Sequence, residues 1–365
     1  MRTSKLVRKL IGIASLFVKS FYFDDNCLIV RVRPSWRKPR CSGCEKHRPG
    51  YDHRDTPVRW VHLGIGATRI ILEYTQRRVE CPDCKVRVEL VPWARADSRF
   101  TRPFEEMTAY LAQITNKTEV SKMMGISWRT VGNIVARIVA ERLDPERLDG
   151  LVRIGIDELS FRKRHRYITT VVDHDKHRIV WAAEGKNSET LDAFFDELGE
   201  ERAGKIEIVT IDMSAAFIKS IKAKVPKAQI VFDLFHVLKL AAIQKHNAPI
   251  YRAYLLKESL AAVFEEASVD AAEKELERWL SWASRSRLKP FVTTAKTIRR
   301  HKDSILAYVE TKLTNGIVEG FNNKLRMIVN RAFGFHSADA LKGMLFLCCG
   351  GVTVNPALPG PWCSW

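Results

Sequence analysis

Residues 151–160 read Leu-Val-Arg-Ile-Gly-Ile-Asp-Glu-Leu-Ser, and this stretch decides how the second half of the chain is interpreted. Its run of Val and Ile is typical of a buried strand. The strand carries the carboxylates of Asp157 and Glu158, and an unpaired charge at a buried sheet is costly. A bound metal ion would offset that cost. The alternative is that Asp157, like Asp212 described next, only caps the turn that follows.

The same pattern returns at residues 205–212, which read Lys-Ile-Glu-Ile-Val-Thr-Ile-Asp. If the two strands lie side by side and parallel, Asp157 and Asp212 meet at their carboxyl ends, where open α/β sheets bind ligands. Two aspartates that converge in this way can hold divalent cations for phosphoryl transfer.

The segments around these strands follow an ordered pattern. After Asp157 we expect strands at 167–172 and 178–183, a helix from Ser188, the Asp212 strand, a helix through Phe217 and a strand at 229–232. Three meandering strands followed by β-α-β-α is the order of a ribonuclease-H-like fold. Residues 237–312 are helical in pattern throughout, which predicts an all-helical insertion. Trp279 and Trp282 within it are expected to be core residues.

A further helix is predicted from Asn315 to Arg331. Its expected apolar face holds Ile317, Val318, Phe321, Leu325, Ile328 and Val329. Its expected polar face holds Glu319, Asn322, Asn323, Arg326 and Asn330. One acid among amides and cations fits a face that supplies a metal ligand and contacts a phosphate backbone.

The charge of the chain favours a polyanionic partner. Its 365 residues hold 60 Lys+Arg against 42 Asp+Glu, a formal net charge of +18 with a pI of about 9.6. Residues 1–100 alone hold 21 Lys+Arg against 10 Asp+Glu. Such an excess makes nucleic acid the first partner to consider, although a merely soluble basic surface is the alternative.

The amino-terminal residues imitate a secretory signal, because a basic start is followed by a short apolar run. Lys19 ends that run, no small-residue cleavage site follows, and no stretch approaches the roughly 20 apolar residues that span a bilayer. We therefore expect a surface helix in a cytoplasmic protein without a membrane partner.

Two Cys-x-x-Cys pairs, Cys41-Ser-Gly-Cys44 and Cys81-Pro-Asp-Cys84, predict a four-thiolate Zn²⁺ site. A hairpin with a strand at 68–79 would account for the 36 residues between the pairs. Disulfides are the alternative, but a chain without an export signal should keep its thiols reduced. His47, His53 and His62 could replace a thiolate, although each is expected at the surface.

Residues 104–114 and 119–137 predict a helix followed by a helix-turn-helix. Gly125 supplies the tight turn and Ser127 the N-cap of the second helix. The expected core residues are Val120, Met124, Ile126, Val131 and Ile134. The residues expected to contact DNA are Arg129, Thr130, Asn133 and Arg137, since Arg and Asn make bidentate contacts to guanine and adenine. An ordinary helical hairpin is the alternative.

These patterns predict a multidomain α+β protein. The expected parts are a zinc-ribbon-like DNA-binding module (1–95), the helix-turn-helix and linker (96–150), the first part of a ribonuclease-H-like catalytic core (151–236), the helical insertion (237–312), the last core helix (313–350) and a loose tail (351–365).

The order of these motifs resembles bacterial insertion-sequence transposases of the IS-L-three family, which are DDE enzymes. The motifs are the Cys pairs, the helix-turn-helix, Gly-Ile-Asp157, Thr-Ile-Asp212-Met, Asp233-x-Phe-His236 and Asn-Gly-x-x-Glu319-Gly-x-Asn. The resemblance implies that Asp157, Asp212 and Glu319 hold two Mg²⁺ (or Mn²⁺) ions. It also implies that His236 belongs to an Asp/Cys-x-x-His signature, and that Arg326, with Asn323 on the same face, contacts transposon-end DNA.

By this resemblance the chain is expected to bind double-stranded DNA at the terminal inverted repeats of an insertion sequence and to cleave and transfer strands. It should act as a homodimer or larger assembly, because two ends must be joined, in the bacterial cytoplasm at the nucleoid. Two alternatives are a DNA-binding regulator of the same fold and a nuclease without strand transfer.

Overall fold

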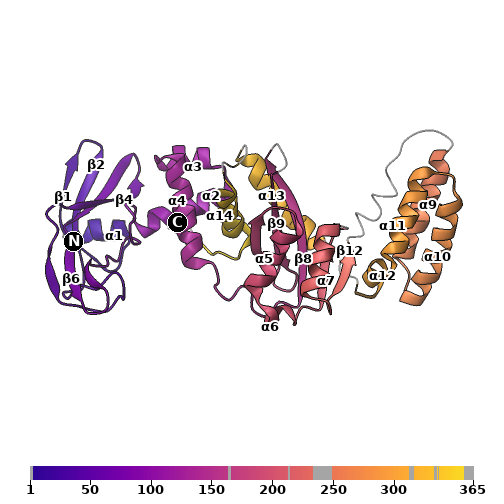
Figure 1. The fold of residues 1–365 in the computed structure, drawn as a ribbon. Coiled ribbons are helices and arrows are strands. Elements are labelled where there is room, and N and C mark those ends of the chain that lie inside the picture. Colours follow the sequence, from indigo (N-terminus) through magenta and orange to yellow (C-terminus); the bar gives the residue numbers. More distant parts are fainter. Residues whose placement is uncertain are drawn as a thin grey trace. The chain divides into compact units, whose positions relative to one another are not determined.

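The computed structural model describes residues 3–162, 166–212, 214–232, 249–311, 316–332, 335 and 337–356 (Figure 1). The chain forms two compact units. The first runs to Ile138 and includes the residues from Thr353 onward, and the second is Val139–Val352. His236, Asp233 and Asn315, which the sequence singled out, lie outside the described residues.

The first unit begins with α1 (Thr3–Ile11) and a four-stranded sheet in the order β1-β2-β5-β4. The strands are β1 (Leu16–Asp24), β2 (Cys27–Pro34), β4 (Val58–Ile65) and β5 (Thr68–Tyr74). One face is a core of buried apolar residues centred on Trp93. Strands β1 and β2 form a hairpin, in which the chain reverses at Asp25, whose φ is 49°. An Asp-Asp-Asn sequence is a turn signal that predicts this reversal.

A smaller sheet, in the order β3-β6-β7, carries Cys81 at the end of β6 and Cys84 in the turn to β7, and Cys41 and Cys44 lie close to this pair. Its strands are β3 (Gly50–His53), β6 (Arg77–Cys81) and β7 (Lys85–Val88). Buried Glu89 links the two sheets. Its carboxylate accepts a hydrogen bond from the Tyr74 hydroxyl (2.6 Å) and from the backbone N–H of Arg77 (2.8 Å), and it pairs with the Arg77 guanidinium (2.6 Å). A buried charge that is fully paired in this way fixes the junction between the sheets.

Helices α2 (Arg102–Ile114), α3 (Lys117–Met124) and α4 (Trp128–Arg142) form the helix-turn-helix region. Gly125 ends α3 in the left-handed conformation with a φ of 64°, and the Ser127 hydroxyl accepts from the Thr130 N–H at 3.1 Å. Both local predictions are therefore confirmed. Of the expected core, Val120, Val131 and Ile134 are fully buried, whereas Met124 and Ile126 are only partly covered.

A buried ionic network holds α2 and α4 together. Arg95 pairs with Glu105 at 2.9 Å and with Glu106 at 2.7 Å, while Arg137 of α4 pairs with Glu105 at 2.5 Å. Glu106 also accepts from the backbone N–H of Asn355 at 3.0 Å. The tail after Gly350 was expected to be loose, but Asn355 is tied to α2.

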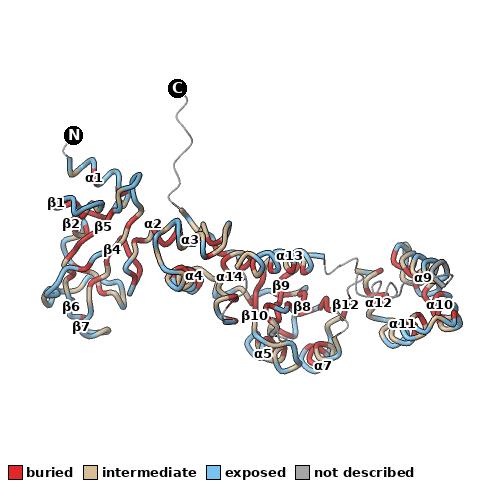
Figure 2. The backbone as a smooth tube through the Cα atoms, turned by 90° about the horizontal axis from the view of Figure 1, so that it is seen from above, coloured by how far each residue is buried: buried red, intermediate tan, exposed pale blue. Residues whose placement is uncertain are grey.

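The second unit contains a five-stranded sheet in the order β10-β9-β8-β11-β12. Its strands are β8 (Arg153–Arg162), β9 (Arg166–Asp173), β10 (Arg178–Glu184), β11 (Ile208–Ile211) and β12 (Gln229–Phe232). The first three strands pair antiparallel, and β11 lies parallel to both β8 and β12. This is the predicted ribonuclease-H-like order. Its central strands are buried along most of their length (Figure 2).

Helices α5 (Ser188–Leu198), α6 (Glu200–Ala203) and α7 (Ala215–Lys224) supply the connections of this sheet. The expected helical insertion is present as α9 (Pro249–Val263), α10 (Val269–Arg285), α11 (Lys289–Arg300) and α12 (Lys302–Thr311). Trp279 is buried and donates from Nε1 to the Leu256 carbonyl at 2.6 Å, whereas Trp282 is exposed. Both tryptophans were expected in the core, and only Trp279 is a core residue.

Two further helices, α13 (Gly316–Arg331) and α14 (Ala338–Cys349), complete the unit. Helix α13 packs on β8 and α14 packs on β10. In the described part of the chain, none of the helices combines the length and the apolar character needed to cross a membrane.

Candidate active site and DNA-binding modules

Asp157 and Asp212 lie beside each other in the five-stranded sheet. Only Asp212 follows the end of its strand, because β8 continues past Asp157 to Arg162, so the expectation that Asp157 ends a strand was wrong. In the parallel ladder of β8 and β11, Gly155 lies opposite Thr210. Two residues further along each strand the chain reaches Asp157 and Asp212, and side chains two apart lie on the same face. Asp212 also caps the following turn, because its Oδ1 accepts from the Ser214 N–H at 3.0 Å. Asp212 therefore both caps a turn and lies beside Asp157.

Gly155 lets helix α13 approach this edge. A Cβ atom on Gly155 would overlap the side chain of Val318 on α13, and would also crowd His174 Nε2 and Thr210 Oγ1. Those two atoms are themselves hydrogen-bonded at 2.8 Å. A glycine inside a strand is typical of such a close approach. Because Gly155 has no side chain, α13 can lie directly on β8.

Asn322 lies one turn after Val318 on α13 and forms a hydrogen bond with Asp157. Its side-chain N–H donates to Asp157 Oδ2, and only 5% of the residue is exposed. Its Oδ1 is buried and has no partner in the described part of the chain. The sequence placed Asn322 on the outward polar face, and this was wrong, because the contact of Val318 with Gly155 rotates Asn322 inward. Glu319, Asn323 and Arg326 are exposed on α13 as expected.

A further acid lies near the pair. Burial raises the pKa of Glu158, and repulsion from the Asp212 carboxylate raises it further, while Lys186 acts in the opposite direction. The negative charges at this edge are thus close enough to disfavour one another, which suits a position for cations. The sequence singled out Glu158 beside Asp157 on this strand but did not include it in the metal-binding triad.

Glu319 is not gathered against the two aspartates. Among the described residues, the four predicted cysteines are the only set of three or more His, Cys, Asp or Glu whose ligand atoms all lie within 4.8 Å of one another. The aspartates are brought to one edge by the sheet, whereas Glu319 is carried on the neighbouring helix.

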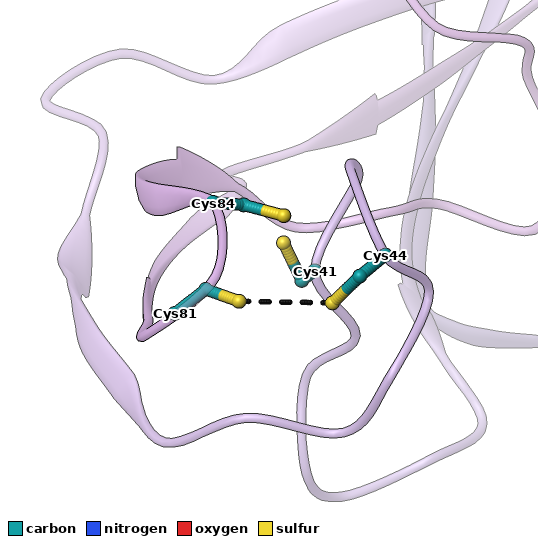
Figure 3. Close-up of side chains that lie close together, drawn as sticks. All are labelled: Cys41, Cys44, Cys81 and Cys84. Carbon is teal, nitrogen blue, oxygen red and sulfur yellow. Dashed lines mark hydrogen bonds between the residues drawn. The ribbon is translucent and has the colours of Figure 1, made fainter.

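The four cysteines point toward one centre (Figure 3). Cys44 Sγ and Cys81 Sγ are 3.6 Å apart, and none of the four forms a disulfide. Gly43 leaves room for this arrangement, because a Cβ there would lie 2.9 Å from Cys84 Sγ. Although burial acts to raise it, hydrogen bonds from the backbone of Cys84 and Asp83 lower the pKa of Cys81 to about 6. Four convergent thiols of this kind fit a structural Zn²⁺ ion.

The three histidines between the pairs have other environments. His47 and His53 are exposed, as expected. His62 was also expected at the surface, but it is buried in β4 with Nδ1 2.8 Å from the Thr101 hydroxyl, and burial lowers its pKa to about 4. In the described structure all four members of the candidate metal group are cysteines.

The predicted DNA-contacting residues of α4 fall into two groups. Arg129 and Asn133 are exposed, and Thr130 is half-buried beside the N-cap. Arg137 is instead engaged with Glu105 in the buried network. Sequence spacing placed Arg137 on the same stripe, but its partner lies 32 residues away, so spacing alone had no means of revealing the ion pair.

The chain matches three family models. A transposase model covers residues 154–244 and 240–345, a model of the helix-turn-helix domain of transposase family ISL3 covers 89–139, and a zinc-finger model of transposases IS204/IS1001/IS1096/IS1165 covers 37–84. These segments coincide with the carboxylate-bearing sheet, the helix-turn-helix and the cysteine cluster.

Whole relatives match as well. The transposase for insertion sequence element IS1557 of Mycobacterium tuberculosis is 34% identical, with 99% of this chain and 98% of that protein covered. The transposase for IS1001 of Bordetella parapertussis is 26% identical, with 86% and 89% covered. The catalytic core domain of BIV integrase aligns at 13% identity over 42% of this chain and all but 1% of that one, but its TM-score of 0.19 is too low to add to the observed sheet order.

The sheet order, the four-cysteine cluster, the helix-turn-helix and the full-length similarity agree with one another. The chain is an insertion-sequence transposase with a DDE-type catalytic domain and a DNA-binding helix-turn-helix, and it belongs to the ISL3 family.

Proposed function

We propose that Asp157, Asp212 and Glu319 form the metal-binding triad of this transposase and that its metal is Mg²⁺ (or Mn²⁺). The observation that carries the proposal is the parallel pairing of β8 with β11, which directs two aspartates to one sheet edge, next to the helix that bears Glu319. Two such ions held by these three carboxylates would supply the Lewis acidity needed for attack by water or a 3′-hydroxyl and for departure of the leaving oxygen in strand cleavage and transfer.

The chain's own residues would prepare this edge for the reaction. The Asn322 amide donates to Asp157 and so fixes the orientation of that carboxylate. Asn323 and Arg326, exposed on the same helix, would contact the phosphate backbone near the cleaved bond. His236 follows a strand that ends beside β11, and we retain it as a catalytic candidate that lies outside the described residues.

We assign end recognition to the helix-turn-helix and the zinc module. Arg129, Thr130 and Asn133 would contact the terminal inverted repeats from the amino-terminal half of α4, as recognition helices do. Arg137 would support this helix through Glu105, in place of the base contact expected from the sequence. Zinc at the four thiols would hold the module in shape.

We further propose that the transposase acts at the bacterial nucleoid, on transposon ends and target DNA. Because two ends must be joined, the working complex would be a homodimer or larger. We also propose that the chain divides at the boundaries expected from the sequence. These give the parts 1–95, 96–150, 151–236, 237–312, 313–350 and 351–365.

Magnesium-dependent nicking of end DNA by the full-length protein tests the triad. Asp157→Asn, Asp212→Asn and Glu319→Gln should each reduce nicking by at least about 10²–10³-fold, the scale of losing one electrostatic stabiliser. End binding should stay near wild type. Glu310→Gln is the matched control, because Glu310 accepts from Gln229 at 3.3 Å and is not part of the triad.

Robust nicking by Glu319→Gln would contradict the assignment and direct attention to Asp233, or to Glu310 if the Glu310→Gln control lost nicking. Wild-type protein that binds ends without nicking them would favour a DNA-binding regulator. Nicking without a joined product from paired ends would favour a nuclease.

A further inference from the structure

On the four-stranded sheet of the first unit, Lys and Arg side chains gather on one part of the face opposite the apolar core, and this part is called the basic face. In β2, Val30 and Val32 are buried, whereas Arg31 and Arg33 alternate with them and point the other way. In β1, Lys19 sits at a bulge where the pairing with β2 shifts between Val18 and Ser20. A bulge redirects the side chain of the extra residue. Lys19, Arg31 and Arg33 therefore share the face opposite the core.

Exposed aromatic rings support two of these cations. The Arg33 guanidinium lies 4.3 Å from the centre of the Phe17 ring, and the Arg31 guanidinium lies 5.2 Å from that of Tyr22. Phe17 is 45% exposed and Tyr22 37%. These cation–π contacts orient the two guanidinium groups in the absence of a ligand. Because the guanidinium groups cover the Phe17 and Tyr22 rings, these rings are less available to stack on nucleic-acid bases.

The basic face continues into a cavity of about 580 Å³. Its cationic lining residues are Lys19, Arg31, Arg33, Arg37 and Arg77. The one acid in the lining, Glu73, already pairs with Arg31 and with Arg59, each at 3.0 Å.

Arg77 is paired with Glu89 outside the lining. Lys19, Arg33 and Arg37, in contrast, have no carboxylate within ion-pair distance in the described part of the chain. Three cations without an internal counterion thus converge on one opening.

We propose that this basic face, formed by Lys19, Arg31, Arg33 and Arg37, binds the sugar–phosphate backbone of duplex DNA. It is a contact additional to the helix-turn-helix and the zinc cluster. Lys19, Arg31 and Arg33 lie outside both matched DNA-module segments, 37–84 and 89–139. The inference rests on this transposase binding DNA.

The chemistry favours a phosphate backbone over other ligands. Lys19, Arg31 and Arg37 are exposed at the rim, where they can meet successive phosphates, whereas a small-molecule site would surround its ligand with buried polar groups. Guanidinium groups match phosphate oxygens in a bidentate geometry. Because backbone contacts carry no sequence information, the site should raise affinity for every duplex.

The salt dependence of DNA binding tests the proposal in the full-length protein. Each phosphate contact contributes about 0.9 to the slope of log Kobs against log salt. The double variant Lys19→Gln/Arg37→Gln should therefore lower the slope by about 1–2, with equal loss of affinity for terminal-repeat and scrambled duplexes. The matched control is Lys5→Gln/Lys9→Gln on α1, which removes the same charge away from the cavity and should keep the wild-type slope.

Several results would overturn the proposal. One is an unchanged slope in the cavity variant, and another is an equal fall in both double variants. Loss confined to single-stranded DNA would identify a strand-binding face instead of a duplex site. Displacement of duplex DNA by inorganic phosphate, at matched ionic strength, would identify a site for free phosphate. Zinc content and thermal unfolding, unchanged from wild type, verify that the variants fold.

Discussion

The cysteine cluster and the carboxylate site differ in how their ligands are brought together. The cysteines lie on two short knuckles of one small domain, and their sulfur atoms already converge. The proposed carboxylate ligands come from β8, from the end of β11 and from α13, more than a hundred residues further along the chain, and the sheet brings only Asp157 and Asp212 beside each other. A structural site is built to be closed, whereas a catalytic site keeps positions open for substrate.

Breaking the cysteine cluster should have the largest effect, and it should stay within the first unit. Cys81→Ser should prevent stable folding of residues 1–95, because binding of a structural zinc contributes on the order of 10 kcal/mol to folding. Zinc content and protection from proteolysis measure this. Cys27→Ser is the control, since Cys27 is a free thiol outside the cluster. A zinc-free wild-type protein purified without chelator would contradict the prediction.

Acid should also destabilise the first unit through His62. Burial lowers the pKa of His62 to about 4 in the folded state, below the ordinary value of 6.5. The unfolded chain therefore binds the proton more readily, so the contribution of neutral His62 is present above pH 6.5 and is lost as pH falls toward 4. It amounts to at most about 3 kcal/mol.

Thermal unfolding of wild type and His62→Gln across this pH range measures the contribution. The variant should show a flatter dependence between pH 6.5 and 4, and the remaining loss should follow zinc release. Identical slopes for the two proteins would show that His62 is not responsible.

The carboxylate site should be sensitive to a single methyl group at Gly155. Gly155→Ala should cost about 1–3 kcal/mol, the usual penalty of overpacking, and should displace α13 from β8. Zinc content should not change. Gly320→Ala is the matched control, because a Cβ at Gly320 on α13 would meet no other atom within 4 Å. Calorimetric unfolding and nicking assays on both variants should show losses of stability and activity in Gly155→Ala but not in Gly320→Ala.

The pair Gly155→Ala/Val318→Ala should recover part of both properties by removing the overlap. Wild-type stability and activity in Gly155→Ala alone would show that α13 does not depend on this contact.

Local chemistry made much of this molecule predictable from sequence. The turn at Gly125, the cap at Ser127 and the two cysteine knuckles each depend on residues within a few positions of one another. The adjacency of the Asp157 and Asp212 strands was also predictable, because parallel strands in a β-α-β order share an edge.

Features that depend on distant partners were not predictable. Asn322 turns inward because Val318 fits against Gly155 on a strand more than 150 residues earlier. Arg137 of α4 pairs with Glu105, a buried residue of α2. Periodicity gives the width of an apolar face but not its rotation by one residue, and that rotation decided the position of Asn322. Arg137 was misplaced for another reason, because spacing within one helix does not reveal an ion pair with a different helix. The glycine within the Gly-Ile-Asp sequence was the one available signal of the close helix.

Manganese binding by the full-length protein tests the central claim most directly, because it reports on the carboxylates without requiring DNA or turnover. Electron paramagnetic resonance should show bound Mn²⁺ in wild type, and that binding should be lost in Asp157→Asn/Asp212→Asn and weakened in Glu319→Gln, while each protein keeps its zinc. Equal Mn²⁺ binding by wild type and the double aspartate variant would contradict the assignment of the metal site to this sheet edge.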